Sequence, residues 1–386
     1  MSILTTHAGS LPRAEALMTF MEAANRGEAI DERAYESEVR RAVADVVRRQ
    51  AELGIDVIDD GEQSKIGFIA YVNERLEGLE LRPPHPGQES PFSGSKEFVA
   101  FPEFYAWVLR TQHGGPGGGI PHMICRGPIA YKGMAKLKSD IDHFKAALAA
   151  VQVTGAFMPS ASPASVEHWQ KNEYYKTDEE YVFAIAAAMR EEYQAIVDAG
   201  FQVQIDDPFL STYYISDPKL TVDDALTFGE MRVEALNHAL RGIPPERVRY
   251  HTCYGINMGP RTTDLEMKHI AGLMLKVNAG AYSFEAANPR HEHEWMVWQS
   301  VKLPDGKKLI PGMITHSSVL VEHPELIAQR LVRFADVVGR ENVIAGSDCG
   351  FATHPSRDPE IHPTIAWAKL KALCEGAQLA TRQLWR

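Results

Sequence analysis

The sequence predicts an α/β protein that forms a single (β/α)8 TIM barrel, in which eight parallel strands are enclosed by helices. Two observations support this prediction. Short apolar runs that end in polar or Gly/Pro residues alternate with long amphipathic helices, and the runs are eight in number. Apolar strands that alternate with helices are typical of parallel β-α units, and eight units favour a closed barrel.

The eight predicted strands cover residues 6–12, 55–62, 156–163, 203–208, 248–255, 281–287, 309–316 and 343–350. Each ends in polar or ionisable side chains. The active site of a barrel lies at the carboxyl ends of its strands, so these side chains are the candidate site residues. They are Ser10, Glu62, Asp206, His251, Cys253, Glu285, His316 and Cys349.

Four helices have clear limits in the sequence. The first begins near Asp31, places a stripe of valines on one face, and stops at Gly54. Glycine is a common helix terminator, and an apolar stripe at this spacing is typical of a helix that packs on a sheet. The other three helices start at Thr177, Thr221 and Pro324.

Residues 78–135 are predicted to form an irregular insertion between the second and third strands. Residues 81–121 are rich in Pro and Gly and include HGGPGGG at 113–119, while residues 123–133 resemble an additional strand. Two interpretations stay open: a surface loop, or a lid or contact in a homo-oligomer. No linker or internal repeat divides the chain, so we expect one domain over residues 1–386.

The composition excludes several classes of protein. A net charge of −11 without a Lys/Arg cluster argues against nucleic acid as a partner and favours a small molecule. No apolar window is long enough for a membrane span, and the N-terminus has no secretory pattern, so we expect a cytoplasmic protein. The four cysteines are too few and too scattered for a disulfide framework.

The strongest local pattern is the pair His251 and Cys253. Residues two apart on a strand face the same side, so both side chains can reach one ion. Cys349 and Glu285, at the ends of two other strands, can supply two more ligands. A histidine, two cysteines and a carboxylate suit tetrahedral zinc (Zn2+), because sulfur ligands favour zinc over magnesium or calcium.

Other roles stay open for several of these polar residues. His291 and His293 are rival metal ligands, although they are also explained as exposed residues at the start of a helix. Asp206 is also explained as a helix N-cap, or as an ion-pair partner of Arg126 or Arg261.

Six motifs carry a resemblance to a known family. They are THAGSLPR, DDGE, QIDDP, HTC, FEAANPRHEHEW and GSDCG. In this order they resemble the C-terminal catalytic barrel of the cobalamin-independent methionine synthase family, and the match covers nearly the whole chain. The sequence is most similar to the short, single-barrel members, a group that also resembles epoxyalkane:coenzyme M transferase.

The resemblance implies a role for each candidate residue. The implied zinc ligands are His251, Cys253, Glu285 and Cys349. The implied thiol-binding residues are Ser10, Glu62 and Asp206. The implied general acid is His316. The sequence departs from the family at two places: the Asp-Glu-Pro motif carries Asp207 in place of the glutamate, and Thr315 replaces the acidic residue before the catalytic histidine.

The predicted function is a zinc-dependent transferase that alkylates or methylates the sulfur of a small thiol. Zinc converts a bound thiol into a thiolate, which is the nucleophilic form. Hydrolytic zinc sites more often use His and carboxylate ligands with an open water position. His316 would protonate the leaving group, or alternatively makes only a structural hydrogen bond. The alternatives are epoxide opening by coenzyme M or a similar thiol, and a zinc lyase or hydrolase.

The charges near the site favour an amino thiol. Glu62 and Asp206 are acceptors for a substrate ammonium, as in homocysteine. The sulfonate of coenzyme M would need a cationic clamp, for which Arg13, Arg126 and Arg290 are the candidates. The alkyl donor stays open among folate, a corrinoid, an epoxide or another donor.

Overall fold

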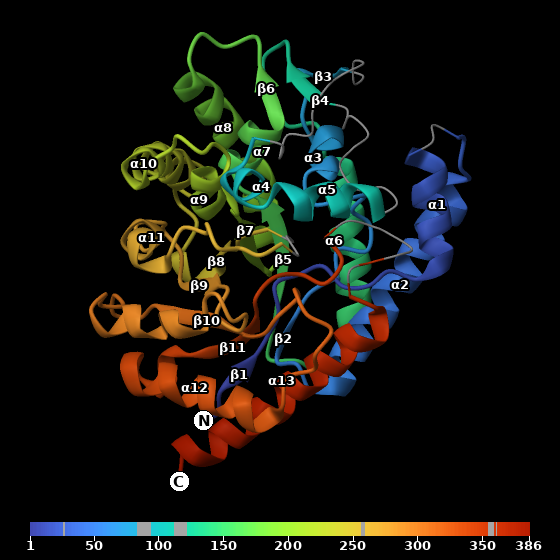
Figure 1. Ribbon diagram of the computed structural model, residues 1–386. Coiled ribbons are helices and arrows are strands. Elements are labelled where there is room, and N and C mark those ends of the chain that lie inside the picture. The colour runs from blue at the N-terminus through green and yellow to red at the C-terminus, as the bar shows by residue number, and fades with distance from the viewer. Residues whose placement is uncertain (26–27, 83–93, 112–121, 256–258, 354–358, 360) are drawn as a thin grey trace.

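Eight parallel strands form a nearly closed barrel in the computed structural model (Figure 1), which confirms the predicted fold. The structure describes residues 1–25, 28–82, 94–111, 122–255, 259–353, 359 and 361–386. Neighbouring strands follow the order β1-β11-β10-β9-β8-β7-β5-β2. Their bounds are β1 Leu4–Thr5, β2 Val57–Ile58, β5 Gly155–Ala161, β7 Gln202–Asp206, β8 Val248–Thr252, β9 Ala281–Phe284, β10 Lys308–Ile314 and β11 Ile344–Ser347.

Side-chain hydrogen bonds join β1 and β2, the two ends of that order. The backbone N–H of Thr5 donates to Asp56 Oδ2 at 2.8 Å, and Thr6 Oγ1 donates to the carbonyl of Val57 at 2.8 Å. The prediction of a first strand over residues 6–12 is wrong, because the strand ends at Thr5. Gly9 adopts a φ of 123°, a conformation that favours glycine and breaks the extended run.

The helices enclose the strands, and their limits follow the predicted signals. Asp31 caps α2 by accepting from the amides of Arg33 and Ala34, and Gly54 ends it with a φ of 83°. No described helix is long and apolar enough to cross a membrane. The α-helices around the barrel are α1 Glu15–Asn25, α2 Glu32–Leu53, α3 Ala70–Arg75, α6 Met134–Leu148, α7 Pro163–Trp169, α8 Asp178–Asp198, α9 Phe209–Thr212, α10 Val222–Ala239, α11 Met267–Met274, α12 Pro324–Val338 and α13 Pro363–Leu384. The 3₁₀ helices are η1 Tyr213–Ile215, η2 Pro245–Arg247, η3 Glu292–Gln299 and η4 Arg340–Asn342.

The inside of the barrel contains a buried cation that ties strands together. Arg249 of β8 is only 1% exposed, and its guanidinium donates to Thr6 Oγ1 at 2.9 Å and to the carbonyl of His7 at 3.0 Å. It also lies 3.7 Å from the ring centre of Phe157. Burial lowers the pKa of Arg249 to about 9. A buried charge is tolerated when it is hydrogen-bonded. The two hydrogen bonds of Arg249 link β8 to the segment after β1.

The predicted insertion lies between β2 and β5, and its described part is more regular than expected. It carries β3 (Leu79–Arg82), α4 (Lys96–Ala100), α5 (Pro102–Thr111) and β4 (His122–Cys125). With β6 (Gln170–Asn172), β3 and β4 form a second, three-stranded sheet at one edge of the molecule (Figure 1). The HGGPGGG run lies outside the described residues.

Helix α4 of the insertion is attached to two loops that follow barrel strands. Lys96 Nζ donates to the carbonyls of Pro218 and Leu220, in the segment after β7. Glu97 accepts a hydrogen bond from the amide of Thr262, in the segment after β8. The insertion therefore contacts the carboxyl end of the barrel, where the candidate site residues lie.

Candidate metal centre

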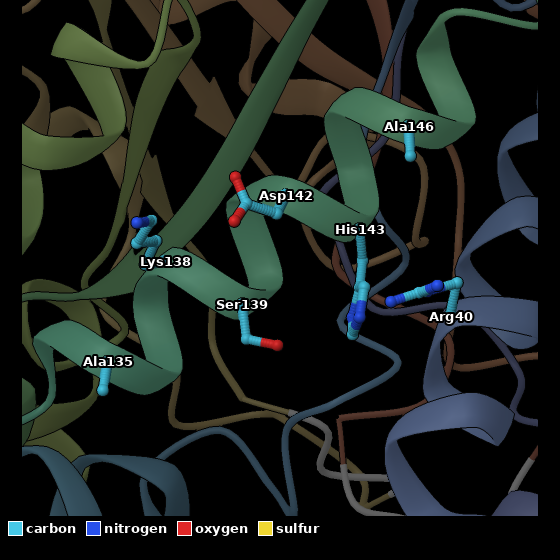
Figure 2. A pocket seen from close by; sticks show the side chains of 7 residues that line it. All are labelled: Arg40, Ala135, Lys138, Ser139, Asp142, His143 and Ala146. Atoms are coloured by element: carbon cyan, nitrogen blue, oxygen red, sulfur yellow. The ribbon is translucent and has the colours of Figure 1, made fainter. Parts of the chain in front are cut away.

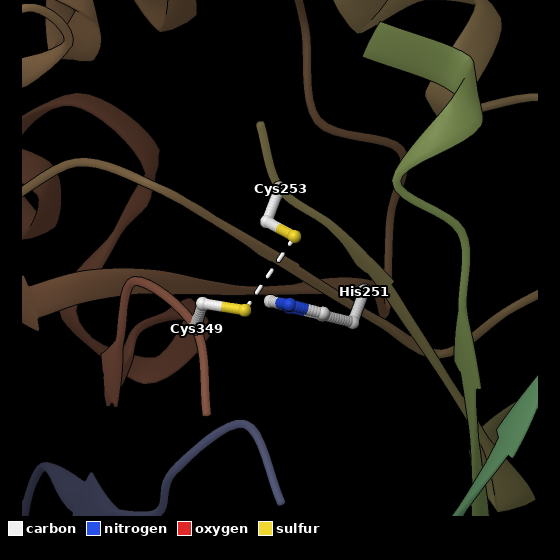
Figure 3. A group of neighbouring side chains, drawn as sticks. All are labelled: His251, Cys253 and Cys349. Carbon is white, nitrogen blue, oxygen red and sulfur yellow. Dashed lines mark hydrogen bonds between the residues drawn. The ribbon is translucent and has the colours of Figure 1, made fainter. Parts of the chain in front are cut away.

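Three buried side chains converge at the carboxyl ends of β8 and β11 (Figure 3). His251, Cys253 and Cys349 offer ligand atoms that all lie within 4.8 Å of one another. The sulfur atoms of Cys253 and Cys349 are 3.5 Å apart. The structure thus brings together three of the four residues that the sequence suggests as metal ligands.

The imidazole of His251 is oriented by the neighbouring strand. The β8–β9 register places Ser283 opposite His251, and its Oγ lies 3.0 Å from Nδ1. With a proton on Nδ1, the lone pair of Nε2 is free, and this buried atom has no hydrogen-bond partner within the described chain. Metal-binding histidines are commonly held by a hydrogen bond from the other ring nitrogen. This donor set fits zinc, which prefers nitrogen and sulfur ligands.

The two cysteines share a proton. Cys349 Sγ donates to Cys253 Sγ, and this bond lowers the pKa of Cys253 well below its ordinary value despite burial. The same interaction, together with burial, raises the pKa of Cys349. One sulfur is therefore already suited to be a thiolate, and a bound cation would favour deprotonation of the second.

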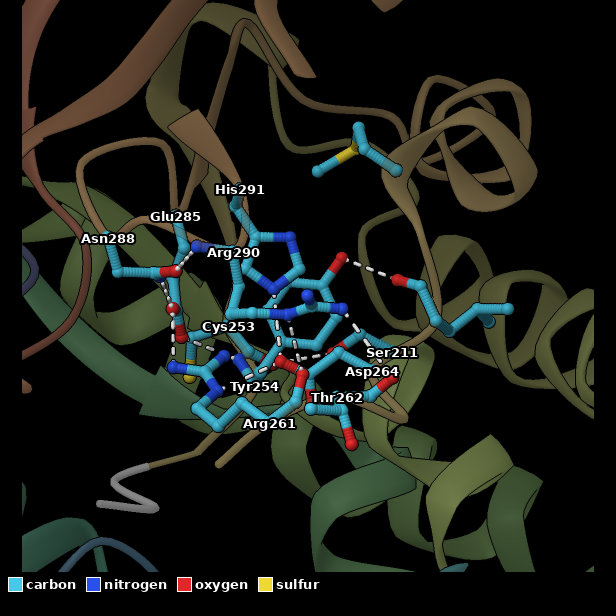
Figure 4. A network of polar contacts seen from close by, with 12 residues as sticks. Ser211, Cys253, Tyr254, Arg261, Thr262, Asp264, Glu285, Asn288, Arg290 and His291 are labelled. Atoms are coloured by element: carbon cyan, nitrogen blue, oxygen red, sulfur yellow. Dashed lines mark hydrogen bonds and ion pairs between the residues drawn. The ribbon is translucent and has the colours of Figure 1, made fainter. Parts of the chain in front are cut away.

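Glu285 lies just outside this group (Figure 4). Its Oε1 accepts from the amide of Tyr254 at 2.7 Å. Its Oε2 accepts from Arg261 at 2.9 Å and from Asn288 Nδ2 at 2.6 Å. The carboxylate is 1% exposed, and both of its oxygens are used in these bonds. Glu285, the fourth suggested ligand, therefore bonds to protein donors and is not part of the group formed by His251, Cys253 and Cys349.

His291 is neither exposed nor available as a ligand. Its Nδ1 lies 2.7 Å from Glu294 and its Nε2 lies 3.0 Å from Asp264. Burial lowers its pKa, but the two carboxylates outweigh this and raise it to about 9. The interpretation of His291 as an exposed residue is wrong, because it forms a buried ion-pair network, whereas His293 is exposed.

Of the suggested substrate-binding residues, Ser10 lies beside the metal group, whereas Glu62 contacts Lys65. Ser10 is adjacent to the residue after Cys349, since a Cβ on Gly350 would come within 2.1 Å of Ser10 Oγ. Glu62 has a left-handed φ of 54°, and Lys65 Nζ lies 3.5 Å from its Oε2. Both Ser10 and Glu62 are buried.

Asp206 stands opposite His251 in the β7–β8 register. Its Oδ1 accepts from Gln204 Nε2 at 2.8 Å. Burial raises the pKa of Asp206 to about 7, partly offset by His251. Asp206 is therefore a buried acceptor next to the candidate metal ligands, and neither Lys65 nor Gln204 was suggested by the sequence.

The arginines suggested as a sulfonate clamp are engaged elsewhere. Arg13 donates to the carbonyls of Ala352 at 2.7 Å and Glu62 at 2.8 Å. Arg126 pairs with Glu173 at 2.9 Å, and Arg290 donates to the carbonyl of Arg261. The interpretation of Asp206 as a partner of Arg126 or Arg261 is wrong, because Arg126 pairs with Glu173 and Arg261 pairs with Glu285 and Asp264.

His316 is buried after β10. Its Nε2 donates to the carbonyl of Gly255 at 3.2 Å, and its Nδ1 has no partner among the residues the structure describes. Burial lowers the pKa of His316, and the Asp348 carboxylate partly offsets this. Thr315, which replaces the family's acidic residue, instead bonds Ser317 Oγ at 2.8 Å.

Asp348 is a further site residue that sequence reasoning did not single out. It accepts from the amides of Ala286, Ala287 and Asn288 at 2.8–3.0 Å. These bonds attach the segment after β9 to the residue before Cys349. The acidic residue of the GSDCG motif is the sequence signal that could have indicated Asp348. Its backbone partners lie about 60 positions away, so the sequence could not indicate them.

A separate hollow lies between α2 and α6 on the outer layer of helices (Figure 2). Its lining mixes both charges and does not include the residues discussed above. It is lined by Arg40, Ala135, Lys138, Ser139, Asp142, His143 and Ala146.

The fold and the site define a (β/α)8-barrel protein with a candidate sulfur-rich metal-binding group at the carboxyl ends of its strands. Residues 3–83 and 126–366 match the model of the cobalamin-independent synthase catalytic domain, so the chain belongs to this family. The unmatched residues 84–125 lie within the predicted insertion. The resemblance noted from the six motifs is thereby confirmed.

Several relatives match over nearly their full length. A methionine synthase of Sulfurisphaera tokodaii is 23% identical over 98% of this chain and 93% of its own length. One of Saccharolobus islandicus is 24% identical over 99% of this chain and 96% of its own length. A B12-independent methionine synthase structure from a Shewanella species, solved with selenomethionine, has a TM-score of 0.71 at 18% identity and covers 100% of this chain and 99% of that one.

We expect Cys349→Ser to lose bound metal while it stays folded. Changes to residues that only support metal ligands cost roughly 10–100-fold in affinity, so the loss of a thiolate ligand should cost more. Metal content per chain and circular dichroism measure the two properties. The control is Cys374→Ala, a buried cysteine in α13, which should keep its metal. Full metal occupancy in Cys349→Ser would disprove the assignment.

Proposed function

We propose that the protein is a zinc-dependent transferase that methylates the sulfur of homocysteine or a closely related amino thiol. The observation that carries the proposal is the buried His/Cys/Cys group with an unsatisfied imidazole nitrogen. Membership of the cobalamin-independent synthase family supports it, as does the name methionine synthase carried by relatives that align over nearly the whole chain.

When bound, zinc supplies acidity that keeps a substrate thiol in its nucleophilic thiolate form. His251, Cys253 and Cys349 would hold the ion. Asp206, which pairs with His251 in the strand register, and Glu62 are buried carboxyl groups, and they would bind a substrate ammonium by charge-assisted hydrogen bonds. Such bonds fix the position of the sulfur relative to the alkyl donor, which is a substantial part of catalysis.

His316 would move the proton that methyl transfer requires. Its lowered pKa keeps the imidazole neutral, and Nδ1 can accept the proton that leaves the thiol. The same nitrogen would then return this proton to the leaving group of the donor. His316 would thus take the proton from the thiol and pass it to the leaving group.

Thiol titration of the zinc-loaded protein tests the function directly. Homocysteine should change the zinc X-ray absorption edge by adding a sulfur neighbour, whereas glutathione should not fit the buried site. Cysteine and coenzyme M complete the series. A spectrum that no thiol changes would favour the zinc hydrolase or lyase class and defeat the proposal.

Asp206→Asn should weaken homocysteine binding by about 1.5–3 kcal/mol, the range for a hydrogen bond to a charged group. The matched control ligand is 4-mercaptobutyrate, which lacks only the ammonium. Its affinity should change much less, because it makes no ammonium contact with Asp206. Calorimetric titration of both ligands measures the difference. Equal losses for the two would show that Asp206 does not bind the ammonium.

His316→Asn should lower turnover by about 10²–10⁴-fold, the usual contribution of general acid–base catalysis, and leave the zinc content unchanged. The loss should be large for an epoxide or a tertiary-amine methyl donor, whose leaving atoms need a proton. It should be small for a sulfonium donor, which leaves as a neutral thioether, because zinc makes the bound thiol acidic enough to lose its own proton without His316. Steady-state rates with the three donors provide the measurement. The same loss with all three would mean that His316 only shapes the site.

A further inference from the structure

The loop between β10 and α12 is closed at its base by a buried ion pair. Lys369 of α13 is 0% exposed, and its Nζ donates to the two carboxylate oxygens of Glu322 at 2.9 Å and 3.1 Å. It also donates to the carbonyl of Leu320. Glu322 in turn accepts a hydrogen bond from the backbone amide of Thr315 at 2.8 Å. Lys369 thus holds both ends of residues 315–322, although it lies 47 positions after Glu322 in the chain.

The tip of this loop is not held by apolar packing. Val319, Leu320 and Val321 are 57%, 76% and 46% exposed. Removal of apolar surface from water is the dominant favourable term in folding, and these three side chains contribute little to it. The contacts that fix the loop are therefore the polar ones at its base.

Helix α13 approaches α12 closely, and α12 begins two positions after Glu322 (Figure 1). A Cβ on Gly376 of α13 would come within 2.4 Å of Ile327 Cγ2 and within 2.9 Å of the carbonyl oxygen of Pro324. Glycine therefore permits an approach that a larger residue would obstruct. This packing sets the amine of Lys369 against the carboxylate that precedes α12.

We propose that Lys369 is a positioning residue that acts through Glu322 to hold His316, the residue directly after Thr315, where it can exchange a proton with the reacting groups. This inference rests on the proposed function, because it assigns support for the proton transfer by His316. Within the described chain the ring of His316 makes one hydrogen bond, from Nε2 to the carbonyl of Gly255. Its position therefore depends on its backbone, and a displacement of about 1 Å can cost about 10²-fold in rate.

Charge explains why the backbone at Thr315 needs Lys369. The side chain of Glu322 is 8% exposed, and Lys369 is its cationic partner among the described residues. A buried carboxylate that loses its partner is strongly destabilised. Without Lys369, Glu322 would move toward water and release the amide of Thr315. The residue that precedes the proton-transferring histidine would then lose its anchor.

Hydrogen exchange of the full-length protein with added zinc tests the anchoring without a measurement of turnover. Lys369→Met should speed the exchange of the Thr315 amide, because this amide loses a fixed acceptor and opens locally. The matched control is Lys371→Met on the same helix, since the Lys371 side chain is 67% exposed and pairs with Glu375 on the surface. It should exchange like the wild type. Unchanged exchange in Lys369→Met would overturn the anchoring.

Kinetics in combination with His316→Asn test whether Lys369 acts through His316. With an epoxide or a tertiary-amine donor, Lys369→Met should lower turnover by about 10–100-fold and leave the zinc content unchanged. With a sulfonium donor, whose leaving group needs no proton, turnover should stay close to that of the wild type. In the His316→Asn background, Lys369→Met should cause little further loss, because the effects of residues that act as a unit are not additive.

A fold defect is separated from a positioning effect by a second variant. If Lys369→Met does not fold, Lys369→Gln replaces it, because the amide keeps a hydrogen-bond donor for Glu322. The same dependence on the donor is expected, with smaller losses.

Two kinetic results would overturn the role of Lys369. One is an equal loss with all three donors, and the other is a pair of losses, from Lys369→Met and His316→Asn, that multiply when the variants are combined. Either would show a general effect on the structure. Failure of the proposed function has a different result, namely a wild-type protein that alkylates homocysteine with none of the donors, and the exchange experiment would still decide whether Lys369 anchors the loop.

Discussion

The Nε2 atom of His251 is buried, and nothing in the described part of the chain satisfies it, while two buried sulfurs converge on the same ring. A buried polar atom without a hydrogen bond lowers the stability of the fold, and His251 Nε2 is such an atom at the carboxyl end of β8. The pairing register of β8 with β9 sets Ser283 against Nδ1, and the register with β7 sets Asp206 on the other side. The sheet itself thus orients the donor and places a carboxyl group beside it.

Contacts between loops keep the remaining donors in place. Asp348 accepts hydrogen bonds from three backbone amides of residues 286–288, which fixes the segment after β9 next to the segment after β11 that carries Cys349. This requires a glycine at position 312, since a Cβ there would come within 2.0 Å of Asp348 Oδ1. The position of Glu285 therefore depends on a residue in β10 that has no chemical role. Such support of a site by packed, hydrogen-bonded neighbours is a general requirement for geometric precision.

Much of this arrangement could be predicted from the sequence, for identifiable reasons. The alternation of apolar strands and helices predicts the barrel, and Asp31 and Gly54 mark the ends of a helix because caps are local. His251 and Cys253 lie two apart, so strand geometry predicts that they share a face. The buried partners could not be predicted, because Ser283 reaches His251 only through strand register. His291 was misjudged because one of its buried partners, Asp264, lies 27 positions away in the chain.

The charges around the site also bear on the type of reaction. A neutral imidazole and two thiolates, from His251, Cys253 and Cys349, would balance the charge of a divalent cation. If the carboxylate of Glu285 is neutralised by Arg261, it adds no net charge to this balance. A substrate thiolate entering next would make the group negative overall, and excess negative charge increases the electron density on sulfur. Such a sulfur is suited to attack an alkyl carbon. A strongly Lewis-acidic ion, as hydrolysis needs, would instead require fewer thiolates.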